Sequence, residues 1–166
     1  SRGSVTSEID FGRNRTCRAY ETSRNFETVR VEGLSDSAAD AEICNSNLAD
    51  YQVPVELPAN RPQRKITTKW HPLWKLQTRR AEPKRIVTTV YNGEKDPLND
   101  NKELTCIVDG DPRLPDGITR LAVVCKRYEQ ATADESGNLG FNAAEIDKRS
   151  WSYSYNSYGQ IKTEIG

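Results

Sequence analysis

Residues 150–165 read SWSYSYNSYGQIKTEI and give the clearest indication of the fold class of this chain. The first half of this stretch alternates serine with three aromatic residues, Trp151, Tyr153 and Tyr155. A period of two places all of these rings on one face of a β-strand, whereas a helix would scatter them. Residues 156–159 contain the Asn and Gly that tight turns need, and strand-like residues follow them. The stretch therefore predicts a β-hairpin.

The same pattern occurs near the start of the chain, where residues 18–33 read RAYETSRNFETVRVEG, and more loosely in residues 85–93, RIVTTVYNG. Tyr20 aligns with Tyr155, and the residues that follow the two tyrosines match in kind. An isolated hairpin is only marginally stable in water, so each copy is expected to lie beside other strands. We predict a single β region over 1–166, with repeat units at approximately 4–32, 64–93 and 149–166 and irregular insertions at approximately 33–63 and 93–120.

The repeats assign roles to particular residue types. The aromatic residues are predicted to pack inward, and these are Tyr20, Tyr91, Trp151, Tyr153 and Tyr155. The residues predicted to form turns, because Asn and Gly tolerate positive φ, are Asn92, Asn156 and Gly159. The insertions are rich in Asp, Asn, Pro and Gly, with one short helix expected over 36–43 and capped by Ser35 or Asp36.

The composition favours a thin or extended molecule. Only 35% of the 166 residues are hydrophobic, so a deep core would be hard to fill. Lys plus Arg and Asp plus Glu both number 24, so no global field draws the chain to nucleic acid or to an anionic membrane. The apolar runs are far too short to span a bilayer. The predicted fold is mostly β, with antiparallel hairpin repeats forming an extended curved sheet that carries irregular loop insertions.

The four cysteines allow two interpretations. Close Cys-x-x-Cys pairs are absent and there is one histidine, which argues against a zinc site. Two local disulfides, Cys17–Cys44 and Cys106–Cys125, would each close a loop of about twenty to thirty residues and contribute about 3 kcal/mol. The alternative is four unpaired, partly buried thiols. Disulfides would indicate an oxidising, extracytoplasmic setting.

Two segments resemble a known family. Residues 151–164, WSYSYNSYGQIKTE, are similar to the tyrosine-aspartate repeat of RHS (rearrangement-hotspot) proteins, and residues 66–93, ITTKWHPLWKLQTRRAEPKRIVTTVYNG, resemble the linking segments of such bacterial chains. The first copy departs from the repeat, because Glu21 replaces the usual Asp and Arg24 the usual Gly. The resemblance implies an arc of a β-ribbon shell, often enclosing a toxin, in a secreted or surface-displayed bacterial protein.

Candidate catalytic and metal-binding residues have simpler interpretations. His71 could act as a base near neutral pH, but no nucleophile motif accompanies it, so we interpret it as a packing or turn residue. The carboxylates of Asp109, Asp111 and Asp116 are of the type calcium prefers, yet their spacing matches no EF-hand and Asp-Gly ordinarily forms turns. Asn14 begins a glycosylation sequon. We predict no enzyme activity, no cofactor and no metal.

Two functions remain after these exclusions. The first is a non-enzymatic wall segment, whose open sheet edges bind further RHS-type chain or copies of itself. The alternative is an adhesin-like glycan-binding module, because aromatic and basic residues of the kind that stack on sugars occur close together at Trp70, Trp74, Arg79 and Arg80. The competing interpretation of these four residues is that the tryptophans pack and the arginines keep a sheet face soluble.

Overall fold

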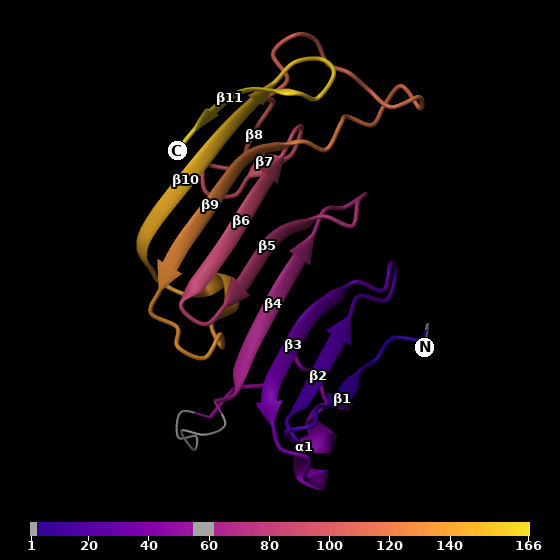
Figure 1. Cartoon of the computed structure of the whole chain (residues 1–166), viewed down its shortest axis with the longest axis vertical. Coiled ribbons are helices and arrows are strands. Elements are labelled where there is room, and N and C mark those ends of the chain that lie inside the picture. The colour runs from indigo at the N-terminus through magenta and orange to yellow at the C-terminus, as the bar shows by residue number, and fades with distance from the viewer. Residues whose placement is uncertain (1–2, 55–61) are drawn as a thin grey trace. The chain divides into compact units, whose positions relative to one another are not determined.

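The computed structural model describes residues 3–54 and 62–166 and is mostly β (Figure 1). The chain divides into two compact units, Ser1–Ile86 with Ala131–Ile146 and Val87–Gln130 with Asp147–Gly166. Strands β6 (Arg85–Tyr91) and β10 (Glu145–Tyr155) each begin in the first unit and continue into the second. The predicted mostly-β, antiparallel fold is confirmed.

The first unit contains five neighbouring strands in chain order. They are β1 (Ser7–Ile9), β2 (Arg15–Tyr20), β3 (Glu27–Leu34), β4 (Arg64–Trp70) and β5 (Gln77–Glu82), and each pairs antiparallel with the next. Short turns join them except between β3 and β4, where the first insertion lies. This insertion contains the helix α1 (Ala38–Ile43), and the 3₁₀ turn η1 (Gly140–Asn142) also belongs to the unit.

Alternation along β2 and β3 gives this pair of strands one apolar and one charged face. Cys17 lies opposite Val31 in the register, whereas the next residue, Arg18, lies opposite Arg30. The apolar face buries Cys17, Val29, Val31, Leu34 and Leu48 as one cluster, and Ile43 of α1 packs against it. The period-two pattern therefore determines which side chains enter the core.

Helix α1 forms where the sequence predicts a helix, but its cap differs from the prediction. The N-cap is Ser37, whose Oγ accepts a hydrogen bond from the Asp40 amide at 3.1 Å. The expected caps, Ser35 or Asp36, are therefore wrong. Ser35 instead donates from its amide and its hydroxyl to the Asp40 carboxylate, both at 2.6 Å, which holds the chain just before the helix.

The second unit contains the strands β6, β9 (Val124–Thr132), β10 and β11 (Ile161–Ile165), which neighbour one another in that order. A separate two-stranded ladder pairs β7 (Lys95–Asp96) with β8 (Lys102–Glu103). The apolar cluster of this unit consists of Cys106, Cys125 and Tyr155, with Tyr153 packed against it.

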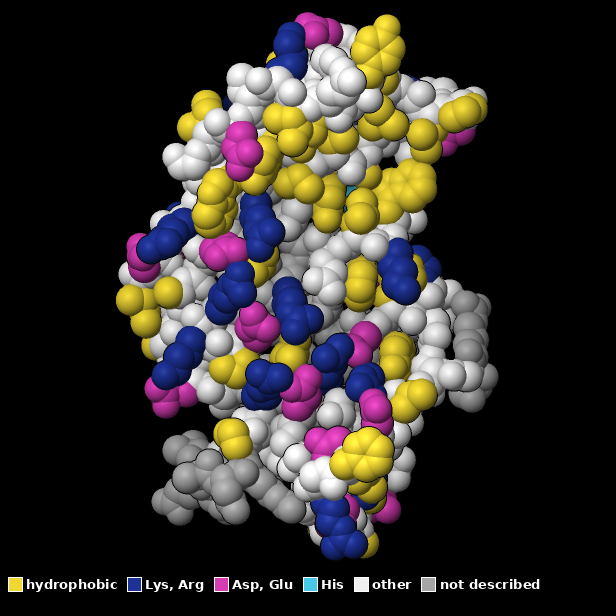
Figure 2. Space-filling view, viewed as in Figure 1, with side chains coloured by type: hydrophobic (Ala, Val, Ile, Leu, Met, Phe, Trp, Pro, Cys, Tyr) yellow, Lys and Arg dark blue, Asp and Glu magenta, His cyan; other side chains and the backbone are white. Residues whose placement is uncertain are grey.

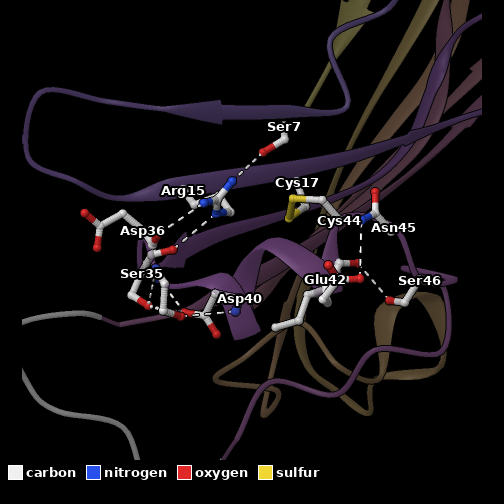
Figure 3. Close-up of a disulfide and its surroundings, with 12 residues drawn as sticks. Ser7, Arg15, Cys17, Ser35, Asp36, Asp40, Glu42, Cys44, Asn45 and Ser46 are labelled. Carbon is white, nitrogen blue, oxygen red and sulfur yellow. Dashed lines mark hydrogen bonds between the residues drawn. A yellow bond between two sulfur atoms is a disulfide. The ribbon is translucent and has the colours of Figure 1, made fainter.

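Both predicted disulfides are present, and none of the four cysteines is free. Cys17–Cys44 joins β2 to the residue after α1 (Figure 3), and Cys106–Cys125 joins the second insertion to β9. The interpretation as four unpaired thiols is therefore wrong. Two such bonds indicate an extracellular or otherwise oxidising environment.

The predicted hairpin forms in the first and last copies of the repeat but not in the middle copy. The first copy forms β2–β3 and the last forms β10–β11. After β6, however, the chain leaves the sheet through residues 93–123 and returns as β9, which neighbours β6. The middle unit, 64–93, thus contributes the strands β4, β5 and β6, but the turn after Tyr91 closes no hairpin, because the strand that follows it in the sheet, β9, is distant in sequence.

The turns of the two hairpins differ in length by one residue. The Asn156 amide donates to the carbonyl of Gln160 at 3.0 Å, whereas the Glu21 amide donates to that of Phe26 at 2.9 Å. Near the end of each turn one residue adopts a positive φ, +77° at Gly159 and +62° at Asn25. Asn25, rather than Arg24, therefore takes the position of the turn glycine, and the alignment of the two copies shifts by one residue after Tyr20.

Candidate interaction surfaces

Strand β11 is an exposed edge of the sheet. All five of its residues are exposed, with Ile161 60% and Ile165 68% accessible to solvent. β10 is its neighbour, so the other side of β11 presents backbone N–H and C=O groups to solvent. At the other end of the strand order, β1 is also fully exposed. Such edges are templates for pairing with another strand.

The structure beneath β11 holds it firmly in place. Tyr155 on β10 donates its hydroxyl to the carbonyl of Val124 at 2.9 Å, and its amide donates to the carbonyl of Cys106 at 2.8 Å. The Asn156 side-chain oxygen accepts from the amides of Tyr158 and Gln160, both at 3.0 Å. Asn156 therefore shapes the turn through its side chain, and β11 leaves this turn in a defined direction.

The cross-strand contacts of β11 differ between its two faces. Ser154 and Thr163 lie opposite each other, and their hydroxyl oxygens are 2.6 Å apart. Lys162 pairs with Asp109 at 2.9 Å. Glu164 makes no ion pair with any residue in the described ranges, which leaves its carboxylate available at the edge.

The predicted packing rings are buried to different degrees. Tyr91 and Tyr155 are buried, and Tyr20, Trp151 and Tyr153 are half-buried. Tyr20 donates its hydroxyl to the carbonyl of Val5 at 2.8 Å, as Tyr155 does to Val124, so the first and last copies use the tyrosine in the same way. Burial raises the pKa of the Tyr91 and Tyr155 phenols above the ordinary value.

Asn92 has a larger role than a turn residue. Its side-chain oxygen accepts from the Cys106 amide at 3.1 Å, and its side-chain nitrogen donates to the carbonyl of Leu121 at 3.4 Å. The Asn92 amide also donates to the carbonyl of Val123 at 2.9 Å, and Gly93 beside it has the positive φ of +84°. One buried side chain at the start of the second insertion thus contacts the middle of the insertion and the residue that follows its end. Sequence reasoning missed this role, since the partners are distant in sequence.

The residues proposed for glycan contact do not form one cluster. Arg79 lies opposite Lys69 and Arg80 opposite Thr68, so consecutive positions place the two arginines on opposite faces of the sheet. The Arg79 guanidinium covers the ring of Phe141 at 4.6 Å. Arg80 instead pairs with a neighbouring carboxylate on its own strand.

Trp70 packs in a different aromatic cluster, around Phe26. Trp70 donates its indole N–H to the carbonyl of Glu27 at 2.8 Å, and its ring is 5.0 Å from that of Phe26. Arg24 and Lys75 lie over the Phe26 ring, at 4.9 Å and 5.8 Å from its centroid. The half-buried Trp74 belongs to the same turn as Lys75.

His71 and the loop aspartates have structural partners. The Nδ1 atom of the buried His71 accepts from the amides of Leu73 and Trp74, at 3.1 and 3.3 Å, which shapes the β4–β5 turn. The Asp116 carboxylate caps the turn after it, and hydrogen bonds from Thr119 lower its pKa. Among the described residues, no group of three or more His, Cys, Asp or Glu side chains could hold a metal ion.

A continuous row of ion pairs crosses the charged face of the first unit. It runs through Glu8, Arg18, Glu27, Arg30, Glu32 and Arg64, so that charge alternates from β1 to β4. Figure 2 shows basic and acidic side chains interleaved over these strands. Burial opposes ionisation of Glu32, but hydrogen bonds from Arg64 and Arg30 outweigh it and lower the pKa of this carboxyl. This row was not predicted, because it depends on the register between strands.

A pocket of about 480 Å³ lies in the first unit, beside this row. Three carboxylates line it, those of Asp10, Glu32 and Glu135. Each already has a partner within the unit, and these partners are Asn14, Arg64 and Lys84, respectively. Two of the three carboxylates are therefore compensated by a cation, and the third, that of Asp10, accepts from the neutral side chain of Asn14, the first residue of the predicted sequon.

Comparisons of the chain with protein-family models, with curated proteins and with solved structures find no match. Within the described ranges, the helices are too short to qualify as membrane spans.

Proposed function

We propose that this chain is a non-enzymatic, sheet-building segment of a secreted or surface-displayed bacterial protein of the RHS type. Its work is to form part of a wall, which grows by the addition of strands at its edges. The observation that carries the proposal is β11, a strand that is firmly positioned on one side and exposes its backbone and two isoleucines on the other.

The two repeat copies that form hairpins support this role. In both, a tyrosine at the end of the first strand donates its hydroxyl to a carbonyl of another segment. Such a contact fixes the hairpin to its neighbour, so adding hairpins of this kind would extend a sheet one unit at a time. The disulfides would stabilise the wall outside the cytoplasm.

The proposal is tested by extending the chain after Gly166 with a second copy of residues 149–165. Hydrogen exchange should then show protection of the β11 amides and of the added strand that lies next to them. A control extension of equal length replaces, in the added copy, the three strand aromatics that correspond to Trp151, Tyr153 and Tyr155 by serine. Equal exchange of β11 in both proteins would contradict the proposal, because the added repeat would not have extended the sheet.

A glycan-binding module is the second candidate, and the contact of Trp70 with Phe26 beneath Arg24 and Lys75 favours it. Trp74→Ala is the better test here, since Trp70 also supports the fold through Glu27. Binding to a glycan array that Trp74→Ala abolishes, with an unchanged circular dichroism spectrum, would favour this function. An array without bound glycans would exclude it.

A further inference from the structure

The five residues of β11 are self-complementary when the strand is paired with a second copy of itself. An antiparallel register centred on Thr163 places Lys162 opposite Glu164 of the second copy and Ile161 opposite Ile165 of the second copy. Because the pairing has two-fold symmetry, each of these contacts occurs twice. Opposite charges and apolar pairs are the cross-strand combinations that stabilise an antiparallel ladder.

We propose that β11 pairs with β11 of a second copy of this chain, in the antiparallel register centred on Thr163. This interface is isologous, since the same five residues serve both sides. The inference rests on the proposed function, of which it specifies one edge and one partner.

The charged side chains of β11, Lys162 and Glu164, are compatible with this contact. Glu164 has no ion-pair partner among the described residues, and a Lys162 of a second copy would supply one. Lys162 is held by Asp109 at 2.9 Å, and its ammonium group has three N–H donors, so it can contact Asp109 and a second carboxylate together. The Asp109 contact also places the Lys162 side chain before the partner arrives.

Burial of the apolar residues of β11 would favour this pairing in water. Ile161 and Ile165 are among the most exposed large hydrophobic residues of the described chain. Pairing brings each against the isoleucine at the opposite end of the second strand and removes apolar surface from water. A ladder of five residues is small, so we expect a weak dimer with a dissociation constant of roughly 0.1–1 mM.

Charge reversal tests the register directly by sedimentation equilibrium of the whole chain up to about 1 mM. Lys162→Glu and Glu164→Lys each turn two attractive pairs into two repulsive pairs, so each should weaken dimerisation roughly tenfold or more. The double variant restores complementarity and should dimerise like the unchanged chain. A mixture of the two single variants should form a heterodimer, because each supplies the charge that the other lacks. Glu42→Lys, at an exposed position of α1, is the matched control and should leave dimerisation unchanged.

A second variant reports the register independently of charge. Thr163 lies opposite Thr163 of the second copy, where paired Cα atoms are about 4.5–5.5 Å apart, within the range that a disulfide spans. Thr163→Cys should therefore oxidise to a covalent dimer, and Lys162→Cys should do so much less. Equal cross-linking at both positions would overturn the proposed register.

A chain that remains monomeric up to about 1 mM, with β11 amides exchanging freely, would overturn the self-pairing. Dimerisation that survives both single charge reversals would overturn it as well, since another surface would then be responsible. Neither result affects the proposed function, which depends on whether an added repeat protects β11.

Discussion

Replacing Tyr128 by Phe should destabilise the second unit by removing one buried hydroxyl. Tyr128 on β9 donates to the Asp96 carboxylate at 2.6 Å, and both side chains are buried. The other Asp96 oxygen accepts only from the Leu98 amide, at 3.0 Å, among the hydrogen bonds resolved. Phe keeps the ring, so the change isolates the loss of a charge-assisted hydrogen bond in a buried site. We expect the free energy of unfolding to fall by about 1.5–3 kcal/mol.

Urea denaturation measures this change, with Tyr158→Phe as the control. Tyr158 is 86% exposed, so its hydroxyl should contribute less than about 0.5 kcal/mol. A double-mutant cycle with Asp96→Asn should give a coupling energy of about 0.5–3 kcal/mol between the two side chains. The reasoning fails if Tyr128→Phe unfolds at the same urea concentration as the unchanged chain, or if the cycle shows no coupling.

The same pair predicts the behaviour of the protein at alkaline pH. Burial, followed by the hydrogen bond to Asp96, raises the pKa of the Tyr128 phenol in the folded state. As the pH rises, the Tyr128 phenol of the unfolded chain therefore loses its proton before that of the folded chain. The contribution of Tyr128 to the free energy of unfolding is fully present below about pH 10 and declines above it. Tyr128→Phe should show a smaller decline, as followed by urea denaturation at successive pH values. An equal decline in both proteins would contradict this assignment.

Three further predictions concern other parts of the chain. Replacing Cys106 and Cys125 by serine should lower the free energy of unfolding by about 3 kcal/mol, measured by urea denaturation; an unchanged midpoint would show that the loop is ordered without the bond. Glu32 has a lowered pKa in the folded state, so its ionised carboxylate stabilises the fold above about pH 4.5, and this contribution is lost as the pH falls. Glu32→Gln should therefore make the free energy of unfolding fall less steeply at acid pH, and an unchanged slope would exclude this role. Gly137→Ala should destabilise the first unit by more than about 1 kcal/mol, because φ at this position is +83° and the added Cβ would lie 1.9 Å from the carbonyl oxygen of Lys65. An unchanged temperature of thermal unfolding would contradict this prediction.

The sequence was sufficient to predict the local structure of the first and last hairpins, and it favoured the disulfide pairing that is present. The alternation of Trp151, Tyr153 and Tyr155 with serine defines a strand with one aromatic face, because side-chain direction in a strand depends only on position along it. The two cysteine pairs could be assigned because close spacing favours closing short loops.

The identity of neighbouring strands and of contacting side chains depends on the tertiary structure. The sequence predicts a hairpin turn after Tyr91. In the structure, Asn92 makes hydrogen bonds to residues distant in sequence, and the chain forms a long loop before it re-enters the sheet as β9. The ion-pair row and the separation of Arg79 from Arg80 follow from the register between strands, and a shift of one residue would exchange the two faces. Local sequence determines the direction of each side chain along its own strand, whereas its partner depends on where a distant segment comes to lie.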